Sequence, residues 1–191
     1  MTQSLFGHAA PDQRPLADRL RPTRFDDVVG QRGLLAPDAP LRRMVEQDRL
    51  VSSILWGPPG CGKTTLARLM AEIGAFHFEQ ISAIFAGVAD LKKVFEGARA
   101  RRQDGQQTLL FVDEIHRFNK SQQDSFLPVV EDGTIVLLGA TTENPSFELN
   151  AALLSRCQVL VLERLEAQDL EELLARAEAS EDRPLPVDPQ A

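Results

Sequence analysis

The stretch GPPGCGKTT has the residue types and the spacing that bind a nucleoside triphosphate. Its glycines let backbone N–H groups turn inward and approach phosphate oxygens closely, and a helix that follows the loop adds a favourable dipole. We expect Lys63 to reach the β- and γ-phosphates and Thr64 to hold Mg²⁺. The predicted ligands are therefore ATP and Mg²⁺. The residues of this predicted phosphate loop are Gly57, Pro58, Pro59, Gly60, Cys61, Gly62, Lys63, Thr64 and Thr65.

Two carboxylates supply the second half of such a site. In LLFVDE (109–114), four apolar residues predict a buried strand that ends at Asp113 and Glu114. We expect Asp113 to support Mg²⁺ and Glu114 to polarise the attacking water. Two surface carboxylates at a strand end are common by themselves, but together with the phosphate loop they indicate a hydrolytic site.

The run TIVLLGATTEN (134–144) repeats this design, because a buried strand again ends in polar residues at the same edge of the sheet. We expect Thr142 to hydrogen-bond the water and the γ-phosphate, with Asn144 and Thr141 as second choices. A plain polar strand cap is the alternative interpretation.

Arg156 ends a predicted helix in LLSRC, far along the chain from the phosphate loop. A positive charge placed on the developing charge of the γ-phosphate raises the rate by orders of magnitude. The residue pattern alone does not distinguish such an arginine from an ordinary surface arginine.

Short apolar runs alternate with helical patterns from Val51 onward, which is typical of a parallel sheet covered on both faces. The predicted fold class is therefore α/β, a doubly wound P-loop domain with helices on both faces of its sheet. The predicted strands are 52–56, 76–82, 108–114, 134–142 and 158–165. The predicted helices are 65–75, 91–102, 122–132, 147–156 and 169–180.

Several residues near these patterns favour a structural interpretation. His116 forms the string DEIH, which superficially resembles the DExH box of helicases, but no further helicase motif follows it. We interpret His116 as a structural or coupling residue, with the structural role preferred. Five aromatic rings fall mostly in apolar patterns and are expected in the core rather than as platforms for base stacking. They are Phe76, Phe78, Phe85, Phe95 and Phe111.

The composition is that of an ordinary globular protein, with 191 residues, 43% hydrophobic residues and a formal net charge of −7. This charge restricts nucleic-acid binding to a local basic face. The two cysteines lack metal-site spacing, and the chain shows no signal peptide or membrane span, so we expect a reduced, cytoplasmic protein without a membrane partner. We expect a flexible leader at 1–15, an ATPase core at 16–178 and a Pro-rich linker at 179–191.

Four motifs in order carry a family resemblance over about residues 16–175. They are RPTRFDDVVGQ (21–31), GPPGCGKTT, LLFVDEIHRFNKSQQDSFLPVVEDG (109–133) and GATTENPSFELNAALLSRC (139–157). The set resembles the AAA+ ATPases of the clamp-loader clade. It is most similar to the replication-associated recombination protein A family, bacterial relatives of the Werner helicase-interacting protein.

The resemblance implies roles for individual residues. Thr142 matches sensor 1, and Arg156 matches the arginine finger that acts in the site of a neighbouring subunit. The segment that packs around adenine is matched by Arg21, Pro22, Val28 and Val29. The family's chain continues into a helical lid and an oligomerisation region. We therefore expect the lid to be absent or incomplete here and hydrolysis to be weak.

The same resemblance implies a DNA-dependent ATPase that remodels DNA or DNA-bound proteins at stalled replication forks, in replication, recombination and repair. The implied partners are forked DNA and single-strand/double-strand junctions, single-strand binding protein, replisome components and further copies of the chain, at the nucleoid. The alternatives are a clamp-loader or branch-migration ATPase subunit and a non-hydrolysing accessory ATP-binding module. For DNA contact we expect the arginines of the first quarter and a basic set on the second helix. This set is Lys92, Lys93, Arg99, Arg101 and Arg102.

Overall fold

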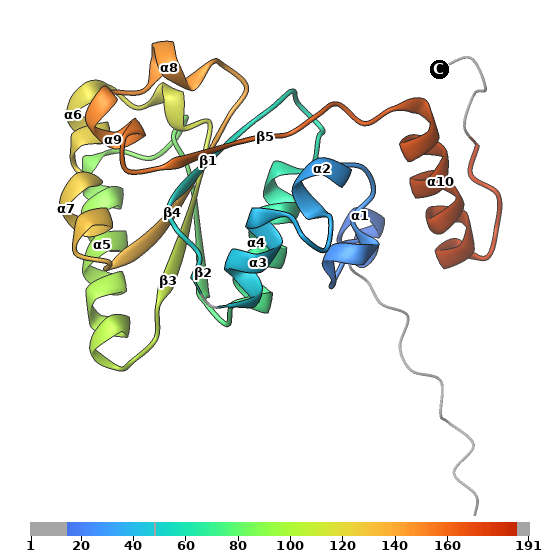
Figure 1. The fold of residues 1–191 in the computed structure, drawn as a ribbon, viewed down its shortest axis with the longest axis horizontal. Coiled ribbons are helices and arrows are strands. Elements are labelled where there is room, and N and C mark those ends of the chain that lie inside the picture. Colours follow the sequence, from blue (N-terminus) through green and yellow to red (C-terminus); the bar gives the residue numbers. More distant parts are fainter. Residues whose placement is uncertain (1–14, 48, 187–191) are drawn as a thin grey trace, which may run out of the picture.

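The computed structural model describes residues 15–47 and 49–186, and its centre is a five-stranded parallel sheet (Figure 1). The strands lie side by side in the order β2-β3-β4-β1-β5. Their bounds are β1 Ser53–Trp56, β2 His77–Ser82, β3 Thr108–Asp113, β4 Ile135–Thr141 and β5 Gln158–Val161. The predicted fold class and all five predicted strands are therefore confirmed. The predicted leader at 1–15 lies almost wholly outside the described residues.

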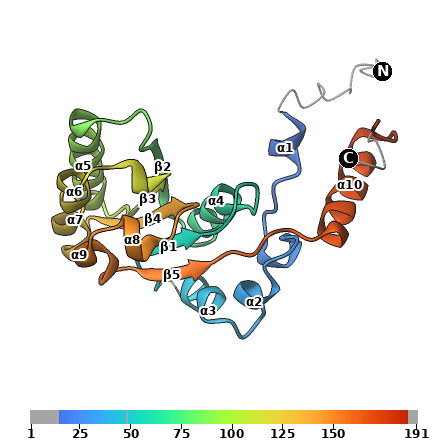
Figure 2. The ribbon, with the colours of Figure 1, turned by 90° about the horizontal axis from the view of Figure 1, so that it is seen from above.

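Helices cover both faces of the sheet (Figure 2). The helices α3 and α4 lie on one face, and α5, α7 and α9 lie on the other. The α-helices are α1 Leu16–Arg19, α2 Arg32–Leu35, α3 Pro40–Glu46, α4 Lys63–Ile73, α5 Val88–Gln103, α6 Lys120–Asp124, α7 Leu127–Glu131, α8 Pro145–Glu148, α9 Ala151–Leu154 and α10 Ala167–Glu181. Two short 3₁₀ helices are η1 Phe25–Asp27 and η2 Ile115–Arg117.

The central strand β4 is buried along its whole length, which explains why its sequence is a continuous apolar run rather than an alternating one. Gly139 in this strand has a packing role. A Cβ atom at Gly139 would lie 2.8 Å from Cδ1 of Ile115 and 2.9 Å from Cδ1 of Ile54. The missing side chain therefore allows η2, which carries Ile115, to pack directly against β4.

Two predicted helices are each divided in the structure. The predicted helix 122–132 is α6 and α7, because Pro128 has no N–H to donate to the carbonyl four residues earlier. The predicted helix 147–156 is α8 and α9, because Leu149 and Asn150 are extended. The Asn150 side chain then accepts a hydrogen bond from the N–H of Leu153 and begins α9 as its cap. The two single-helix predictions were wrong for these local reasons.

The last described helix, α10, lies apart from the sheet and beside the first segments of the chain (Figures 1 and 2). Arg19 of α1 forms an ion pair of 2.8 Å with Glu181 and donates to the Ser180 hydroxyl. Arg176 donates to the carbonyl oxygen of Asp27 in η1. These bonds place the two ends of the described chain on the same side of the molecule. Among the described helices, none is long and apolar enough to cross a membrane.

Candidate nucleotide-binding site

The predicted phosphate loop lies between β1 and α4, as its mechanism requires. Gly60 and Gly62 have φ angles of +77° and +95°, which glycine adopts without the strain that a Cβ atom brings. A Cβ atom at either position would meet nothing within 4 Å. The loop therefore leaves open space beside its backbone, and Gly62 caps the N-terminus of α4. This cradle fits a phosphate group.

Lys63 and Thr64 are the first two residues of α4, and both side chains are half-buried at the loop. The ammonium group of Lys63 donates hydrogen bonds of 2.8 and 2.9 Å to the carbonyl oxygens of Gly57 and Pro58. Its charge is therefore held over the loop backbone. Cys61 is buried in the same loop, with its Sγ atom 3.9 Å from the Lys63 Nζ atom.

Asp113 and Glu114 lie at the carboxyl end of β3, as predicted, and both are half-buried. The carboxyl ends of β1 and β4 meet at the same edge, because Trp56 pairs in register with Thr141 and the Gly57 N–H donates to the Thr141 carbonyl. Glu114 has a φ of 52° and a ψ of 45°, a left-handed conformation that is uncommon for a residue with a side chain. Such conformations concentrate at functional sites.

Three polar side chains at the end of β4 are candidates for the bond to water and the γ-phosphate, and their hydrogen bonding differs. Thr141 is fully buried, and its Oγ1 atom lies 2.9 Å from Nδ1 of His116. Asn144 caps α8 by accepting a hydrogen bond from the Ser146 N–H. Thr142 is half-buried and forms no side-chain hydrogen bond within the described part of the chain. Of the three, Thr142 therefore has the side chain that is not engaged elsewhere.

A cavity of about 290 Å³ adjoins the phosphate loop, and its walls are mostly apolar. It is lined by the four residues predicted to surround adenine, which are Arg21, Pro22, Val28 and Val29. Gly60, Cys61, Gly62 and Thr65 of the loop form another wall. Leu165, Leu173 and Arg176 close the cavity from the side of α10. The sequence patterns did not indicate this third wall, because an amphipathic helix does not reveal what its apolar face covers.

Gln31 is a residue of this site that the sequence analysis did not single out. Its φ is 56°, and its side chain is buried. The Gln31 amide donates to the carbonyl oxygens of Cys61, at 3.2 Å, and Glu163, at 2.7 Å, and it accepts from the Glu163 N–H at 3.0 Å. One side chain thus joins the segment that lines the cavity to the phosphate loop and to the chain leading into α10. The Gly-Gln pair that ends the RPTRFDDVVGQ motif is the sequence feature that marks it.

Arg156 lies apart from this cavity within the same chain. It follows α9, which packs on the face of the sheet opposite α4. Its guanidinium forms an ion pair with Glu131 at the end of α7 and donates to the Ala152 carbonyl oxygen at 2.8 Å. The fold therefore brings together every predicted site residue except Arg156.

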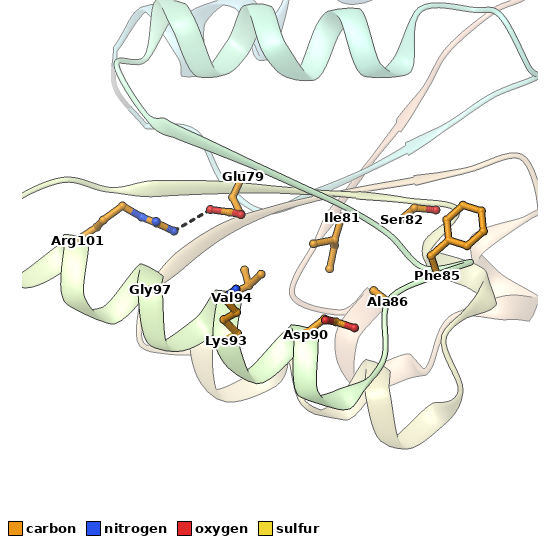
Figure 3. Close-up of a pocket in the computed structure, with 10 residues that line it drawn as sticks. All are labelled: Glu79, Ile81, Ser82, Phe85, Ala86, Asp90, Lys93, Val94, Gly97 and Arg101. Atoms are coloured by element: carbon orange, nitrogen blue, oxygen red, sulfur yellow. Dashed lines mark hydrogen bonds and ion pairs between the residues drawn. The ribbon is translucent and has the colours of Figure 1, made fainter.

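The basic set on α5 is partly engaged in ion pairs. Arg101 contacts Glu79 at 3.2 Å across an open groove of about 670 Å³ between β2 and α5, which Lys93 also lines (Figure 3). Arg102 lies 3.6 Å from Asp132. Hydrogen bonds from Thr134 lower the pKa of the Asp132 carboxyl, and the nearby positive charge of Arg102 lowers it further. Lys92 also lies 4.0 Å from Glu96, so three of the five predicted cations are paired with neighbouring carboxylates.

Phe85 at the end of this groove is not a core residue, and that prediction was wrong (Figure 3). Its side chain is 87% exposed, and Ile84 and Val88 beside it in the sequence are exposed as well. The reason is local. The Asp90 side chain accepts a hydrogen bond of 2.8 Å from the Gly87 N–H, which starts α5 at Val88 and leaves Phe85 in the preceding loop.

Comparison with known proteins decides the family. The model of the ATPase family associated with various cellular activities (AAA) matches residues 53–165, which contain the phosphate loop, Asp113 and Glu114. The chain belongs to the AAA family. Membership implies that this AAA domain binds a nucleotide together with a divalent metal ion.

Curated relatives share much of this sequence. Replication-associated recombination protein A of Coxiella burnetii is 57% identical over 171 residues, which are 90% of this chain and 38% of that protein. The protein of the same name in Escherichia coli is 54% identical over 164 residues, 86% of this chain and 37% of its own. ATPase WRNIP1 of Dictyostelium discoideum is 51% identical over 162 residues. The predicted resemblance is confirmed, and the AAA chain spans less than two fifths of the length of these relatives.

Solved structures with the same fold include the RuvB Holliday junction branch migration motor of Thermotoga maritima. It is 28% identical, with a TM-score of 0.65, and the match covers 85% of this chain and 55% of that one. A mutant of the same RuvB has a TM-score of 0.68 at 28% identity, over 86% of this chain. The sheet and its covering helices therefore share the fold of this branch migration motor.

Proposed function

We propose that this chain hydrolyses ATP as part of an assembly that remodels DNA or DNA-bound proteins at stalled replication forks. One observation carries the hydrolytic part. The phosphate loop, Asp113 and Glu114 lie at one edge of the sheet, beside an apolar cavity of about 290 Å³. The cationic loop suits the triphosphate, and the two carboxylates suit its metal ion and the attacking water. The apolar cavity suits the adenine.

The triphosphate is held by the loop and the first turn of α4. Backbone N–H groups around Gly60 and Gly62 face the phosphates, and Lys63 places its charge on the β- and γ-phosphates. The Thr64 hydroxyl and the Asp113 carboxylate would hold the divalent metal, which would supply positive charge to neutralise the phosphates. Arg21, Pro22, Val28 and Val29 surround the adenine.

Hydrolysis needs a water molecule held in line with the γ-phosphate. In the proposed reaction Glu114 polarises this water, and Thr142 hydrogen-bonds the water and the γ-phosphate. Arg156 lies on the opposite side of its own sheet, so its charge reaches the nucleotide of a neighbouring copy rather than its own. Assembly of several copies is therefore part of the proposed mechanism.

The DNA part of the proposal is supported by similarity to proteins named for replication-associated recombination, 54 to 57% identical over most of this chain. The exposed α5 side of the molecule supports it as well. Phe85 offers an exposed aromatic ring, and Lys93 lines the same groove (Figure 3). Aromatic rings beside cations suit single-stranded nucleic acid, because bases stack on the rings and phosphates meet the charges. The partners would then include single-strand binding protein and replisome components at the nucleoid in the cytoplasm.

A second candidate function is branch migration, because RuvB, a branch migration motor, shares the fold at 28% identity. The choice of DNA substrate distinguishes fork remodelling from branch migration. Forked DNA and a four-way junction, each carrying a fluorophore and quencher, are incubated with the chain and ATP, and with the Lys63→Ala variant as the blank. Strand separation or protein release on the fork supports the proposal. Branch migration on the junction alone supports the second candidate.

The other two alternatives, a clamp-loader subunit and a non-hydrolysing accessory module, predict different results. A clamp-loader subunit would place a ring-shaped clamp on primed DNA and leave both fluorescent substrates intact. A non-hydrolysing accessory module would bind ATP without turnover and would change the activity of a longer homologue when the two are mixed.

A further inference from the structure

His116 lies between two side chains at the carboxyl edge of the sheet, the Glu114 carboxylate after β3 and the Thr141 hydroxyl at the end of β4. It belongs to η2, and its side chain is 8% exposed. Its Nδ1 atom is 3.2 Å from Oε2 of Glu114 and 2.9 Å from Oγ1 of Thr141. One ring nitrogen therefore contacts both the residue proposed to polarise water and the residue next to Thr142.

The hydrogen-bond roles in this group are satisfied together in one arrangement. Oγ1 of Thr141 accepts from the Glu143 N–H at 3.0 Å and donates its single proton to the Glu143 carbonyl oxygen at 3.2 Å. The Glu114 carboxylate only accepts. With the Thr141 proton given to Glu143, Nδ1 of His116 carries its own proton and donates it to Thr141 Oγ1. The Glu114 carboxylate lies 3.2 Å from the same nitrogen as a close electrostatic contact. With the proton on Nε2 instead, a nitrogen lone pair would face the carboxylate.

We infer that His116 is a positioning residue that fixes Glu114 against Thr141 through an Nδ1–H donor. The inference rests on the proposed function, since it assigns Glu114 the task of polarising water. Glu114 needs such a support because its backbone is left-handed, with a φ of 52°, and its side chain is 26% exposed. The contact makes the carboxylate and the Thr141–Thr142 segment move as one unit. Ile115 packs on Gly139 and so holds η2, which carries His116, in position for this contact.

A purely structural role, in which the ring only fills space, predicts different effects of substitution. The side-chain nitrogen of asparagine takes about the place of Nδ1, whereas that of glutamine takes about the place of Nε2. We expect His116→Asn to keep turnover within about threefold. We expect His116→Gln and His116→Ala to lower kcat about 10- to 100-fold, because a misplaced catalytic group costs about that much. The affinity for a fluorescent ATP analogue should stay within about twofold in all three variants. A space-filling role instead predicts that glutamine, the larger side chain, is tolerated better than asparagine and that losses follow the melting temperature.

The tautomer of His116 gives a readout that does not need turnover. The chain has three histidines, so its imidazole ¹⁵N resonances are few, and His116→Asn identifies those of residue 116. We expect the Nδ1–H form in the unmodified chain. We expect a shift toward Nε2–H in Glu114→Ala, because the carboxylate charge that favours a proton on Nδ1 is then gone.

The outcomes separate the two proposals. Nδ1–H together with an asparagine variant that outperforms the glutamine variant supports the positioning role. An Nε2–H form in a chain that hydrolyses ATP overturns the contact and leaves the proposed function intact. An Nδ1–H form in a chain without turnover makes the contact merely structural and contradicts the proposed hydrolysis.

Discussion

The side chain of Gln31 forms two hydrogen bonds with the backbone of Glu163, 132 residues later in the sequence. Its amide nitrogen also donates to the Cys61 carbonyl oxygen in the phosphate loop. One buried amide thus joins three segments: the phosphate loop, the segment that lines the cavity, and the residues that lead into α10. Gly30 tightens the same junction, since a Cβ atom there would lie 2.6 Å from Cδ2 of Leu165.

Gln31→Ala should weaken both the fold and the nucleotide site, because it leaves the Cys61 and Glu163 carbonyl oxygens and the Glu163 N–H group without this partner. The expected loss in the free energy of unfolding is about 1–3 kcal/mol. Nucleotide affinity, measured by titration with a fluorescent ATP analogue, should fall with it. Gln168→Ala, at an exposed position of α10, is the matched control and should change neither quantity. Equal behaviour of the two variants would contradict the role given to Gln31.

Two inactive variants should restore activity when they are mixed, if Arg156 acts on a neighbouring copy. Glu114→Gln should bind ATP without hydrolysing it, and Arg156→Ala should lack the cation for its neighbour's site. A random equal mixture should then regain about a quarter of the unmodified activity, because about one interface in four joins an intact carboxylate to an intact arginine. Steady-state ATP hydrolysis measures this. Arg24→Ala, at an exposed arginine, is the control. No recovery on mixing would exclude action in trans.

Phe85→Ala should weaken binding to forked DNA and leave nucleotide affinity unchanged. Loss of one stacking ring costs about 1–3 kcal/mol, which is roughly a 5- to 150-fold rise in Kd. Phe147→Ala is a close control, because Phe147 is 84% exposed, like Phe85, but lies on α8. Fluorescence anisotropy at several salt concentrations would measure both variants. The affinity of the unmodified chain should fall steeply with salt, since phosphate contacts release counterions. An affinity independent of salt, or equal losses in the two variants, would refute this DNA-contacting face.

Cys157 should react slowly with alkylating reagents in the folded chain. Burial raises the pKa of its thiol from 9.0 to about 12, and the thiolate is the reactive form. Cys61 is 3% exposed, so it is shielded from the reagent. At pH 8, iodoacetamide should therefore modify the native chain at least about 100-fold more slowly than the chain in urea. A thiol that reacts at the unfolded rate would contradict this burial.

The raised pKa of Cys157 also sets how the stability of the fold changes with pH. The folded-state pKa of Cys157 lies above the unfolded value, so its contribution to stability is complete below pH 9 and declines as the pH rises toward about 12. Denaturant unfolding at pH 8 and pH 10.5, compared with Cys157→Ser, would measure the Cys157 contribution to this decline.

The sheet could be predicted from the sequence because its three middle strands, β3, β4 and β1, are apolar runs that are almost entirely buried. The loop and the carboxylates could be predicted because their spacing is tied to a strand end. The arrangement of Thr141, His116 and Glu114 could not, because it depends on how η2 packs against Gly139, a contact between segments distant in sequence. The exposure of Phe85 was missed because an apolar residue in a loop reads as core until the start of the next helix is known.

The central claim is that the edge of the sheet formed by the phosphate loop, Asp113 and Glu114 hydrolyses ATP and that DNA stimulates it. Its most direct test is Mg²⁺-dependent ATP hydrolysis by this 191-residue chain, with and without forked DNA, using Lys63→Ala as the blank. The account predicts turnover that rises with the fork and disappears in the variant. ATP binding without turnover, or turnover that persists in Lys63→Ala, would contradict it.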